Sequence, residues 1–247
     1  MNFFSLFKRQ IIYNLKKKIN VDFENNKINS LEKLFIKYGC DKANIYRNIF
    51  KGGNGYAKFY LKHLRKLKNK KINILEIGSL EGSSAVAFSK FFKKSKIYCF
   101  DINISNFKYA SKNISVFGLD ASKEKSVNEV LKVIGKEKGI IFDVIIDDGS
   151  HKLDDILKFL KIFFKHLKNN GFYIIEEFKF PNYYRHLNIP GEPKIEKLLS
   201  SISRKKYLKS NILTKNFQKE LFQAVDYFKM YKGNNRDSDI VFIKKIK

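Results

Sequence analysis

Five short, largely apolar runs recur along the middle of the chain, and stretches with helical spacing separate each run from the next. The runs are residues 72–77, 97–100, 114–117, 142–146 and 172–175. Apolar runs of this length are typical of strands that are buried on both faces of a sheet. Strands that alternate with helices over short links predict an α/β fold with a doubly wound, mostly parallel sheet.

The C-terminal part of the chain returns to strand character after an irregular segment. Residues 225–231 and 239–246 are separated by Gly233-Asn234-Asn235, which is a turn signal. We therefore expect an antiparallel C-terminal hairpin, which brings the sheet to seven strands. The preceding residues 178–215 hold all three prolines of the chain and break the strand–helix rhythm. They are predicted to form a lid-like insertion over the site.

Residues 1–69 are predicted to form a basic, helical N-terminal extension, ahead of a main domain at 70–247. Within residues 1–30, apolar side chains stand near helical spacing, with basic residues between and after them. Two interpretations are open. The segment is either a helix that packs on the main domain or a peripheral membrane anchor within residues 1–20.

The formal net charge is +26, from 50 Lys and Arg against 24 Asp and Glu, which raises the question of a nucleic-acid partner. Specific recognition of phosphates and bases favours arginine, whereas nearly all of this positive charge is lysine. Lysine, asparagine, isoleucine and phenylalanine are enriched together along the whole length. A compositional bias is therefore favoured, and nucleic acid is disfavoured as a partner.

The cysteines and the apolar runs bear on where the protein works. Two cysteines without metal-ligand spacing, and the lack of a secretory signal pattern, favour a reducing, cytoplasmic location. No apolar run approaches the roughly 20 residues that span a bilayer. If residues 1–20 bind lipid, the location becomes the inner membrane surface. The sequence leaves the oligomeric state open, with a homo-oligomer among the options.

Acidic residues follow every apolar run of the predicted parallel sheet. They are Glu76, Asp101, Asp120, Asp147, Asp148, Glu176 and Glu177. In a doubly wound sheet, ligands bind at the carboxyl ends of the strands. The loop at 78–84 has glycines four residues apart and no lysine, which argues against a polyphosphate or dinucleotide ligand. Acids around such a loop fit S-adenosylmethionine, which carries ribose hydroxyls, amino groups and a carboxylate.

Particular residues suit parts of this cofactor. Ser83 and Ser84 can cap the following helix, whose N-terminus attracts a carboxylate. Asp101 can accept hydrogen bonds from ribose hydroxyls, and Asp120 can meet the adenine amino group. Residues 75–82 (LEIGSLEG), with Asp101 further on, resemble the glycine motif and ribose acid of class I S-adenosylmethionine-dependent methyltransferases. The expected cofactor-binding residues are Glu76, Gly78, Ser79, Gly82, Ser83, Asp101, Asp120, Ala121 and Asp147.

Residues 147–151 (DDGSH) and 171–177 (GFYIIEE) carry a closer resemblance. With the upstream segments KYGCDK (37–42) and GYAKFY (55–60), they resemble the metal-dependent O-methyltransferases of macrolide sugars, of the mycinamicin and macrocin kind. The resemblance covers residues 35–177 and implies a Rossmann-like methyltransferase fold. It also implies that Asp148, Glu176 and Glu177 bind Mg²⁺ and that His151 is the general base, so that Asp148 and His151 are the expected catalytic residues.

Three positions depart from the family pattern. Glu177 stands where an aspartate is usual, Asn54 where a histidine is usual, and Cys40 where a threonine is usual. Several site residues also have alternative roles. His151 can cap the helix that follows it, Asp147 can serve the cofactor or the loop, and Glu177 can face solvent.

These observations predict a Mg²⁺- and S-adenosylmethionine-dependent O-methyltransferase that acts on a sugar hydroxyl of a small molecule or a glycan. The metal would lower the pKa of a bound hydroxyl, and a neutral His151 would then take the proton. Two other enzyme classes are weighed: an RNA methyltransferase, motivated by the charge, and a cephalosporin-hydroxylase-like enzyme, which shares the architecture. A non-catalytic binding module is the third alternative.

Overall fold

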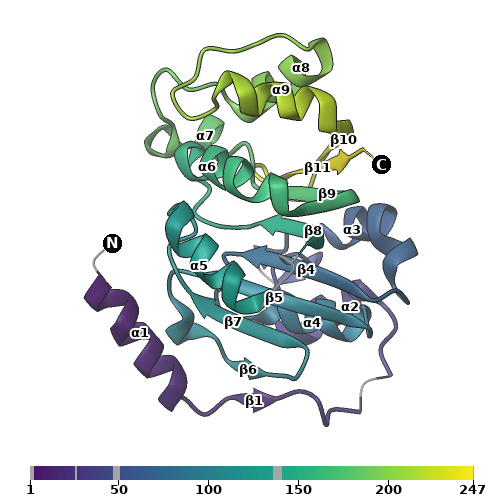
Figure 1. The fold of residues 1–247 in the computed structure, drawn as a ribbon. Coiled ribbons are helices and arrows are strands. Elements are labelled where there is room, and N and C mark those ends of the chain that lie inside the picture. The colour runs from purple at the N-terminus through teal and green to yellow at the C-terminus, as the bar shows by residue number, and fades with distance from the viewer. Residues whose placement is uncertain (1–2, 26, 47–50, 136–140, 247) are drawn as a thin grey trace.

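A computed structural model describes residues 3–25, 27–46, 51–135 and 141–246, and a seven-stranded sheet runs through its centre (Figure 1). The order across the sheet is β10-β11-β9-β8-β4-β5-β7. These strands are β4 (Ile72–Ile77), β5 (Ser95–Asp101), β7 (Ile114–Gly118), β8 (Phe142–Asp147), β9 (Leu167–Glu176), β10 (Val225–Lys232) and β11 (Asp239–Lys245). The strands from β9 to β7 pair in parallel, whereas β11 is antiparallel to both of its neighbours. The predicted mostly parallel sheet with a C-terminal hairpin is therefore confirmed.

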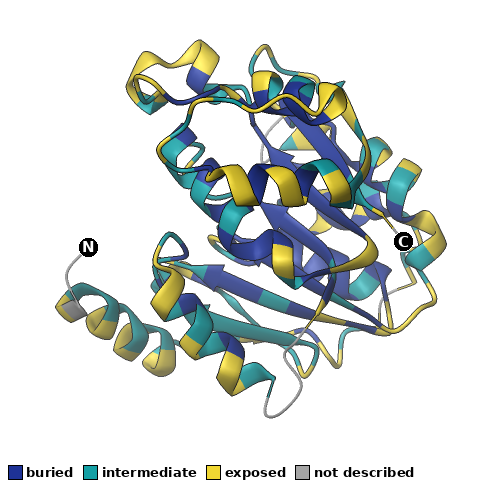
Figure 2. Cartoon of the chain, turned by 45° about the horizontal axis from the view of Figure 1, so that its top comes forward, coloured by how far each residue is buried: buried dark blue, intermediate teal, exposed yellow. Residues whose placement is uncertain are grey.

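Helices cover both faces of the sheet, because successive side chains of a strand point to opposite faces. Leu75 and Ile77 of β4 join one apolar cluster, and Ile72 and Ile74 join the other. Figure 2 shows the buried strands between helices whose outer sides are exposed. On the first face lie α5 (Glu124–Ile134), α6 (Leu153–Phe163), α8 (Ile195–Arg204) and α9 (Lys215–Ala224). On the second face lie α2 (Leu31–Tyr38), α3 (Ala57–Leu64) and α4 (Ser83–Phe91).

The first residues of the chain lie along the β7 edge of the sheet. Helix α1 (Phe3–Leu15) contacts the short helix η2 (Ile104–Asn106) and β7, and β1 (Ile19–Asn20) pairs in parallel with β6 (Tyr109–Ala110). Residues 1 and 2 of the segment considered as an anchor lie outside the described residues. Among the described helices, none is long and apolar enough to cross a bilayer.

The segment after α2 is held to the start of α3 by backbone hydrogen bonds. Helix α2 ends at Tyr38 with Gly39 as its C-cap, and β2 (Ile45–Tyr46) pairs with β3 (Lys51–Gly52) in an antiparallel hairpin. The amides of Asn54 and Tyr56 donate to the carbonyls of Asp41 and Lys42, at 2.7 and 2.8 Å. These bonds join residues 41–42 to residues 54–56, and the two segments together form one wall of the site. Helix α3 continues into the short η1 (Arg65–Leu67).

The structure differs from expectation at the end of α6. The amphipathic pattern of residues 153–167, with Asn169-Asn170-Gly171 after it, predicts a helix from Leu153 to Leu167. The helix instead ends at Phe163, and the single turn η3 (Phe164–His166) follows. Strand β9 then begins at Leu167, and its pairing with β8 shifts register between Phe142 and Val144. The Asn-Asn-Gly segment therefore forms a bulge inside a strand, which an apolar pattern cannot distinguish from a helix end.

The segment 178–215 begins with α7 (Phe180–Tyr183) and η4 (Arg185–Leu187) and continues through α8. Ile195, Leu198 and Leu199 of α8 are buried in the same apolar cluster as α6. Its aromatic start is tied to the hairpin, because the hydroxyl of Tyr183 donates to Asp239 at 2.8 Å. These contacts place the start of the segment next to the carboxyl end of β9.

Candidate active site

A cavity of about 400 Å³ opens at the carboxyl ends of β4, β5, β7 and β8. Eight of the residues predicted to form the site line it: Gly78, Ser79, Ser83, Asp101, Asp120, Ala121, Asp148 and His151. They come from loops that the strand order brings to one edge, as expected for a doubly wound sheet. Glu76, Gly82, Asp147, Glu176 and Glu177 do not line this cavity.

The loop after β4 is shaped by Gly78. Its φ is +85°, and a Cβ atom there would lie 2.0 Å from the carbonyl oxygen of Asp148. The amide of Gly78 donates to the carbonyl of Phe100, and the amide of Asp148 donates to that of Ile77, at 2.8 and 2.9 Å. The loops after β4 and β8 therefore touch through backbone alone, which places the cofactor motif directly beside the DDGSH turn.

The start of α4 corrects one expectation. The N-cap position is Gly82, and no side chain makes a capping hydrogen bond there. Ser83 and Ser84 lie inside the first turn of the helix, so the prediction that they cap it is wrong. Ser83 nevertheless lines the cavity, whereas Gly82 packs against the ring of Phe107.

Asp101 and Asp120 stand at the rim of the cavity with some of their oxygens engaged. Oδ2 of Asp101 accepts the amide of Leu80 at 2.8 Å, and Oδ1 accepts the amide of Asn103 at 2.6 Å. Oδ1 of Asp120 accepts both the amide and the hydroxyl of Ser122. These bonds fix both carboxylates, and each oxygen has a second lone pair for a ligand hydroxyl or amino group.

Glu76 and Asp147 are buried on opposite faces of the sheet. Both oxygens of Glu76 lack a hydrogen-bond partner among the described residues. Burial raises the pKa of Glu76 to about 7, although the nearby Lys42 charge opposes the shift. Asp147 lies on the α6 face, where its Oδ1 accepts the amide of Gly149, and burial raises its pKa well above the ordinary value. Asp147 and Asp148 are thus adjacent in sequence, but their side chains lie in different environments.

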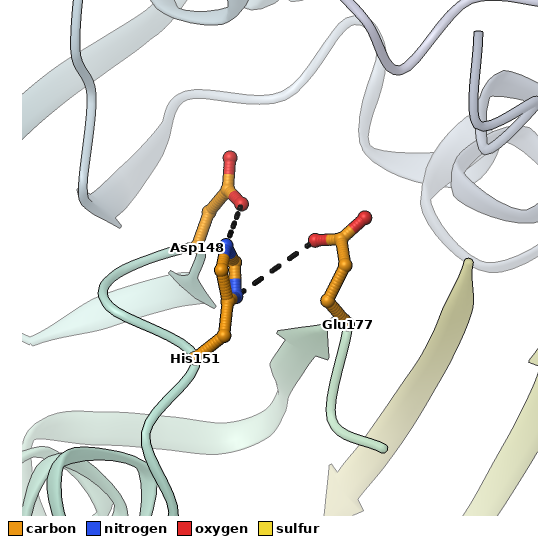
Figure 3. A group of neighbouring side chains, drawn as sticks. All are labelled: Asp148, His151 and Glu177. Atoms are coloured by element: carbon orange, nitrogen blue, oxygen red, sulfur yellow. Dashed lines mark ion pairs between the residues drawn. The ribbon is translucent and has the colours of Figure 1, made fainter. Parts of the chain in front are cut away.

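Three side chains converge beside the cavity (Figure 3). His151 Nε2 lies 3.9 Å from Oδ1 of Asp148, and His151 Nδ1 lies 4.0 Å from Oε2 of Glu177. Each of the three residues offers one ligand atom, and these atoms lie within 4.8 Å of one another. Carboxylate oxygens are the ligands that Mg²⁺ prefers, so this group fits a divalent cation.

His151 holds a strained backbone conformation, with φ at +57°. Its ring packs against Phe180, with the ring centroids 4.9 Å apart. The N-cap of α6 is Lys152, without a side-chain capping bond, so His151 does not cap this helix. Burial lowers the pKa of His151, although the Asp148 charge opposes the shift. A neutral imidazole at this point is able to accept a proton.

Glu177 faces inward, not toward solvent. Its φ is +47°, which turns the chain at the end of β9 and brings the side chain back over the site. Oε1 accepts hydrogen bonds from Nδ2 of Asn54 at 2.9 Å and from the hydroxyl of Tyr56 at 2.8 Å. Burial raises the pKa of Glu177 well above the ordinary value. A nearby cation would offset the free-energy cost of ionising this buried carboxyl group.

Glu176 is held by a different set of partners. Its Oε2 accepts from Nζ of Lys42 at 2.9 Å, and its Oε1 accepts from the hydroxyl of Tyr60. The same Lys42 ammonium lies 2.5 Å from Oδ2 of Asp148. Burial alone would lower the pKa of Lys42, but the charges of Asp148 and Glu176 raise it well above the ordinary value. Lys42 stands in the KYGCDK segment, yet sequence reasoning gave it no role.

The comparisons with known proteins agree with this geometry. The chain is 28% identical over 159 residues to L-olivosyl-oleandolide 3-O-methyltransferase of Streptomyces antibioticus, covering 62% of this chain and 38% of that protein. It is 27% identical over 129 residues to demethylmacrocin O-methyltransferase of Streptomyces fradiae, covering 49% of this chain and 31% of that protein. The chain is similar to macrolide-sugar O-methyltransferases. The matched parts amount to well under half the length of these relatives. No family model matches the sequence.

The fold comparison points to the same group of proteins. MycE, a methyltransferase of mycinamycin biosynthesis solved with Mg, SAH and mycinamycin VI, superposes with a TM-score of 0.66. The identity is 18%, and the match covers 90% of this chain and 56% of that chain. The likeness shows that the chain has the methyltransferase fold, and the resemblance inferred from the motifs is confirmed.

Proposed function

We propose that this protein is a class I S-adenosylmethionine- and Mg²⁺-dependent O-methyltransferase that acts on a sugar hydroxyl of a small molecule or glycan. The observation that carries the proposal is the contact between the two halves of the site. The glycine loop that would hold the cofactor touches the backbone of Asp148, whose side chain belongs to the candidate metal cluster. Relatives named as sugar O-methyltransferases and the fold of MycE support it.

The cofactor half of the site is the lined cavity. When bound, S-adenosylmethionine supplies an electrophilic methyl group. Asp101 and Asp120, fixed at the rim by their backbone bonds, are suited to the ribose hydroxyls and the adenine amino group. Gly78, Ser79 and Ala121 line the same cavity. Glu76 is buried near the end of β4, and in its ionised form its charge would favour a cationic ligand.

The acceptor half is the cluster of Asp148, His151 and Glu177. Asp148 and Glu177 would hold Mg²⁺, which acidifies a bound hydroxyl. Glu176, the third ligand predicted from the sequence, is not part of the cluster of three, and each of its oxygens already accepts a hydrogen bond, from Lys42 and from Tyr60. His151 would accept the hydroxyl proton at a ring nitrogen, and its ring is packed against Phe180.

The cavity does not favour RNA. Its charged lining is mainly acidic: Asp41, Glu81, Asp101, Asp120, Asp148 and Asp155. Lys42 is the cationic lining residue, and its ammonium is engaged by Asp148 and Glu176. A polyphosphate backbone would be repelled at this rim, whereas a neutral sugar would not.

The test compares binding with methyl transfer. Asp148→Ala and His151→Ala should each abolish transfer from S-adenosylmethionine to an acceptor panel of glycosylated macrolides and nucleotide sugars. Calorimetry should still detect cofactor binding by both variants. Asp154→Ala, which removes a helix-surface partner of Lys158, is the matched control and should keep full activity. Turnover that persists in EDTA and in both site variants would overturn the mechanism.

We also propose an anionic membrane surface as a partner, and the features of α1 that support this are its exposed side chains. Phe7, Ile11 and Leu15 share one exposed stripe of the helix, and Leu15 is 82% exposed. Lys8 lies within the same helix, and Lys16, Lys17 and Lys18 follow directly after it in the sequence. An apolar stripe in a lysine-rich segment is complementary to acyl chains beneath anionic headgroups.

A further inference from the structure

Lys42 is the most completely buried cation that contacts the site. Its side chain is 1% exposed, and its ammonium contacts one oxygen of Asp148 and one oxygen of Glu176. A buried ammonium is costly unless it is paired and hydrogen-bonded, and here both requirements are met. The position is therefore built for a charge, and the question is what that charge does for the acids around it.

The backbone that carries Lys42 is fixed on both sides. The carbonyl of Lys42 accepts the amides of Tyr56 and Ala57, and the carbonyl of Ala43 accepts the amide of Gly55. Tyr60, from the helix that follows, donates to the same Glu176 that Lys42 contacts. The backbone at Lys42 is therefore held in place by the wall of the site, and its side chain extends from there to the acids.

The acids outnumber this cation. Asp148, Glu176 and Glu177 bring three negative charges when ionised, and within the described part of the chain Lys42 is the lysine or arginine that contacts them. Two negative charges are left, which is the charge that one divalent cation neutralises.

We propose that Lys42 is a positioning residue of this metal site. Its ammonium supplies one of the three positive charges that balance the three acids, and one divalent cation supplies the other two. The proposal rests on the proposed function and assigns Lys42 a role within it. Lys42 takes Oδ2 of Asp148 and thereby leaves Oδ1 directed toward His151, where the ion would bind. It also retains Glu176 as its own counter-ion.

The experiment separates charge from shape. Lys42→Met keeps the length of the side chain and removes the charge, and Lys42→Arg keeps the charge. Lys42→Met/Glu176→Gln removes one charge of each sign. Lys90→Met is the matched control, because the Lys90 ammonium contacts backbone carbonyls of Val21 and Glu24 and no acid of the site. The melting temperature of each protein is measured in EDTA and in saturating Mg²⁺, and Mn²⁺ binding is measured by calorimetry.

Lys42→Met should have a lower melting temperature in EDTA than the wild type and a larger rise on adding Mg²⁺. Its Mn²⁺ affinity should increase on the order of tenfold, because a positive charge near the ion has been removed. The double variant should recover most of the melting temperature lost in EDTA, since replacing both members of a buried pair costs less than removing one. Lys42→Arg should show a Mg²⁺-induced rise closer to that of the wild type.

Two results would overturn the proposal. One is a Lys42→Met protein whose melting temperature and Mg²⁺ response equal those of the wild type or of Lys90→Met. The other is a folded Lys42→Met protein that no longer binds Mn²⁺. If Lys42→Met does not fold in EDTA, the double variant decides, and a double variant no more stable than Lys42→Met overturns the proposal. None of these readouts needs S-adenosylmethionine or an acceptor, so they stay interpretable if methyl transfer itself is not found.

Discussion

The side-chain amide of Asn54 donates a hydrogen bond of 2.9 Å, from Nδ2, to Oε1 of Glu177. These are two of the three positions at which the sequence departs from the family pattern, and they contact each other. Glu177 is longer than the usual aspartate, and Asn54 is shorter than the usual histidine. The Glu177 carboxylate therefore still fits at the site. Tyr56 adds a second donor to the same oxygen, which leaves Oε2 facing His151.

We therefore expect Asn54→Ala to weaken Mg²⁺ binding without unfolding the protein. Groups that orient a metal ligand typically contribute a factor of 10 to 100 in affinity, and because Tyr56 still donates, we expect roughly tenfold. Calorimetry with Mg²⁺ or Mn²⁺ measures the change. Asn73→Ala, at the opposite end of β4, is the control and should bind the ion as the wild type does. Equal affinities in the two variants would show that Asn54 does not support Glu177.

The rate of methyl transfer should depend on the protonation of His151. Burial lowers the pKa of His151 below its ordinary value of 6.5, and only the neutral imidazole can accept a proton. The rate should therefore be level near pH 7 to 8 and decline as the pH falls below 6.5. Single-turnover rates measured at saturating Mg²⁺ test this. An acidic limb centred above pH 7 would contradict a neutral, buried base.

Glu76 should make the metal-free protein less stable as the pH rises. Its folded pKa is about 7, against 4.5 in the unfolded chain, so the folded state binds a proton more tightly. The associated stability is present below pH 4.5 and is lost as the pH rises toward 7. Glu76→Gln should flatten this decline by an amount on the order of 3 kcal/mol. Urea unfolding of both proteins in EDTA at pH 5 and pH 8 provides the comparison, and parallel declines would refute it.

Gly78→Ala should be strongly destabilising, because a Cβ atom at this left-handed position meets the carbonyl oxygen of Asp148. We expect a loss of more than about 3 kcal/mol in the free energy of unfolding. Gly191 has a similar φ of +84° but nothing within 4 Å of its added Cβ. Gly191→Ala should therefore lose only about 1 kcal/mol, the cost of the backbone conformation. Urea denaturation of both variants separates the clash from the strain.

Binding to anionic vesicles should require the exposed stripe of α1. Phe7→Ser/Leu15→Ser should reduce co-sedimentation with phosphatidylglycerol-containing vesicles while the melting temperature stays unchanged, because both side chains are exposed. High salt should weaken binding of the wild type, since the segment is rich in lysine. Tyr207→Ser, an exposed aromatic near α9, is the control. Unchanged sedimentation of the double variant would count against a lipid surface as partner.

The strand pattern and the acids at the strand ends could be predicted because both depend on local sequence. The five parallel strands and the hairpin appear where apolar runs predicted them, and the rim of the cavity carries the expected Asp101, Asp120 and Asp148. Because successive side chains of a strand point to opposite faces, Glu76 faces away from its sequence neighbours, and Asp147 faces away from Asp148. The sequence pattern does not say which of the two faces holds the site.

What the sequence could not show are the contacts made across the fold. Lys42 is one of 50 basic residues, and only its place against Asp148 and Glu176 distinguishes it from a surface lysine. The engagement of Glu176 by Lys42 and Tyr60 was likewise not predictable from its neighbours in the chain. The α6 boundary was misplaced because Leu167 satisfies a helical and a strand pattern equally well.

The wall that presents Lys42 joins the chain across great sequence distances. Lys42 and Asp148 are 106 residues apart, and Lys42 and Glu176 are 134 apart, whereas the residues that line the cofactor loops after β4, β5 and β7 are close in sequence. Contacts between distant segments form slowly, because their loops must be closed first. The loops of the cofactor cavity can therefore assemble early from neighbouring strand–helix units, whereas the pairing of Lys42 with Asp148 and Glu176 must wait until the segment before β4 meets β8 and β9. Burial of the Lys42 ammonium should accordingly be a late event, which reports that folding is nearly complete.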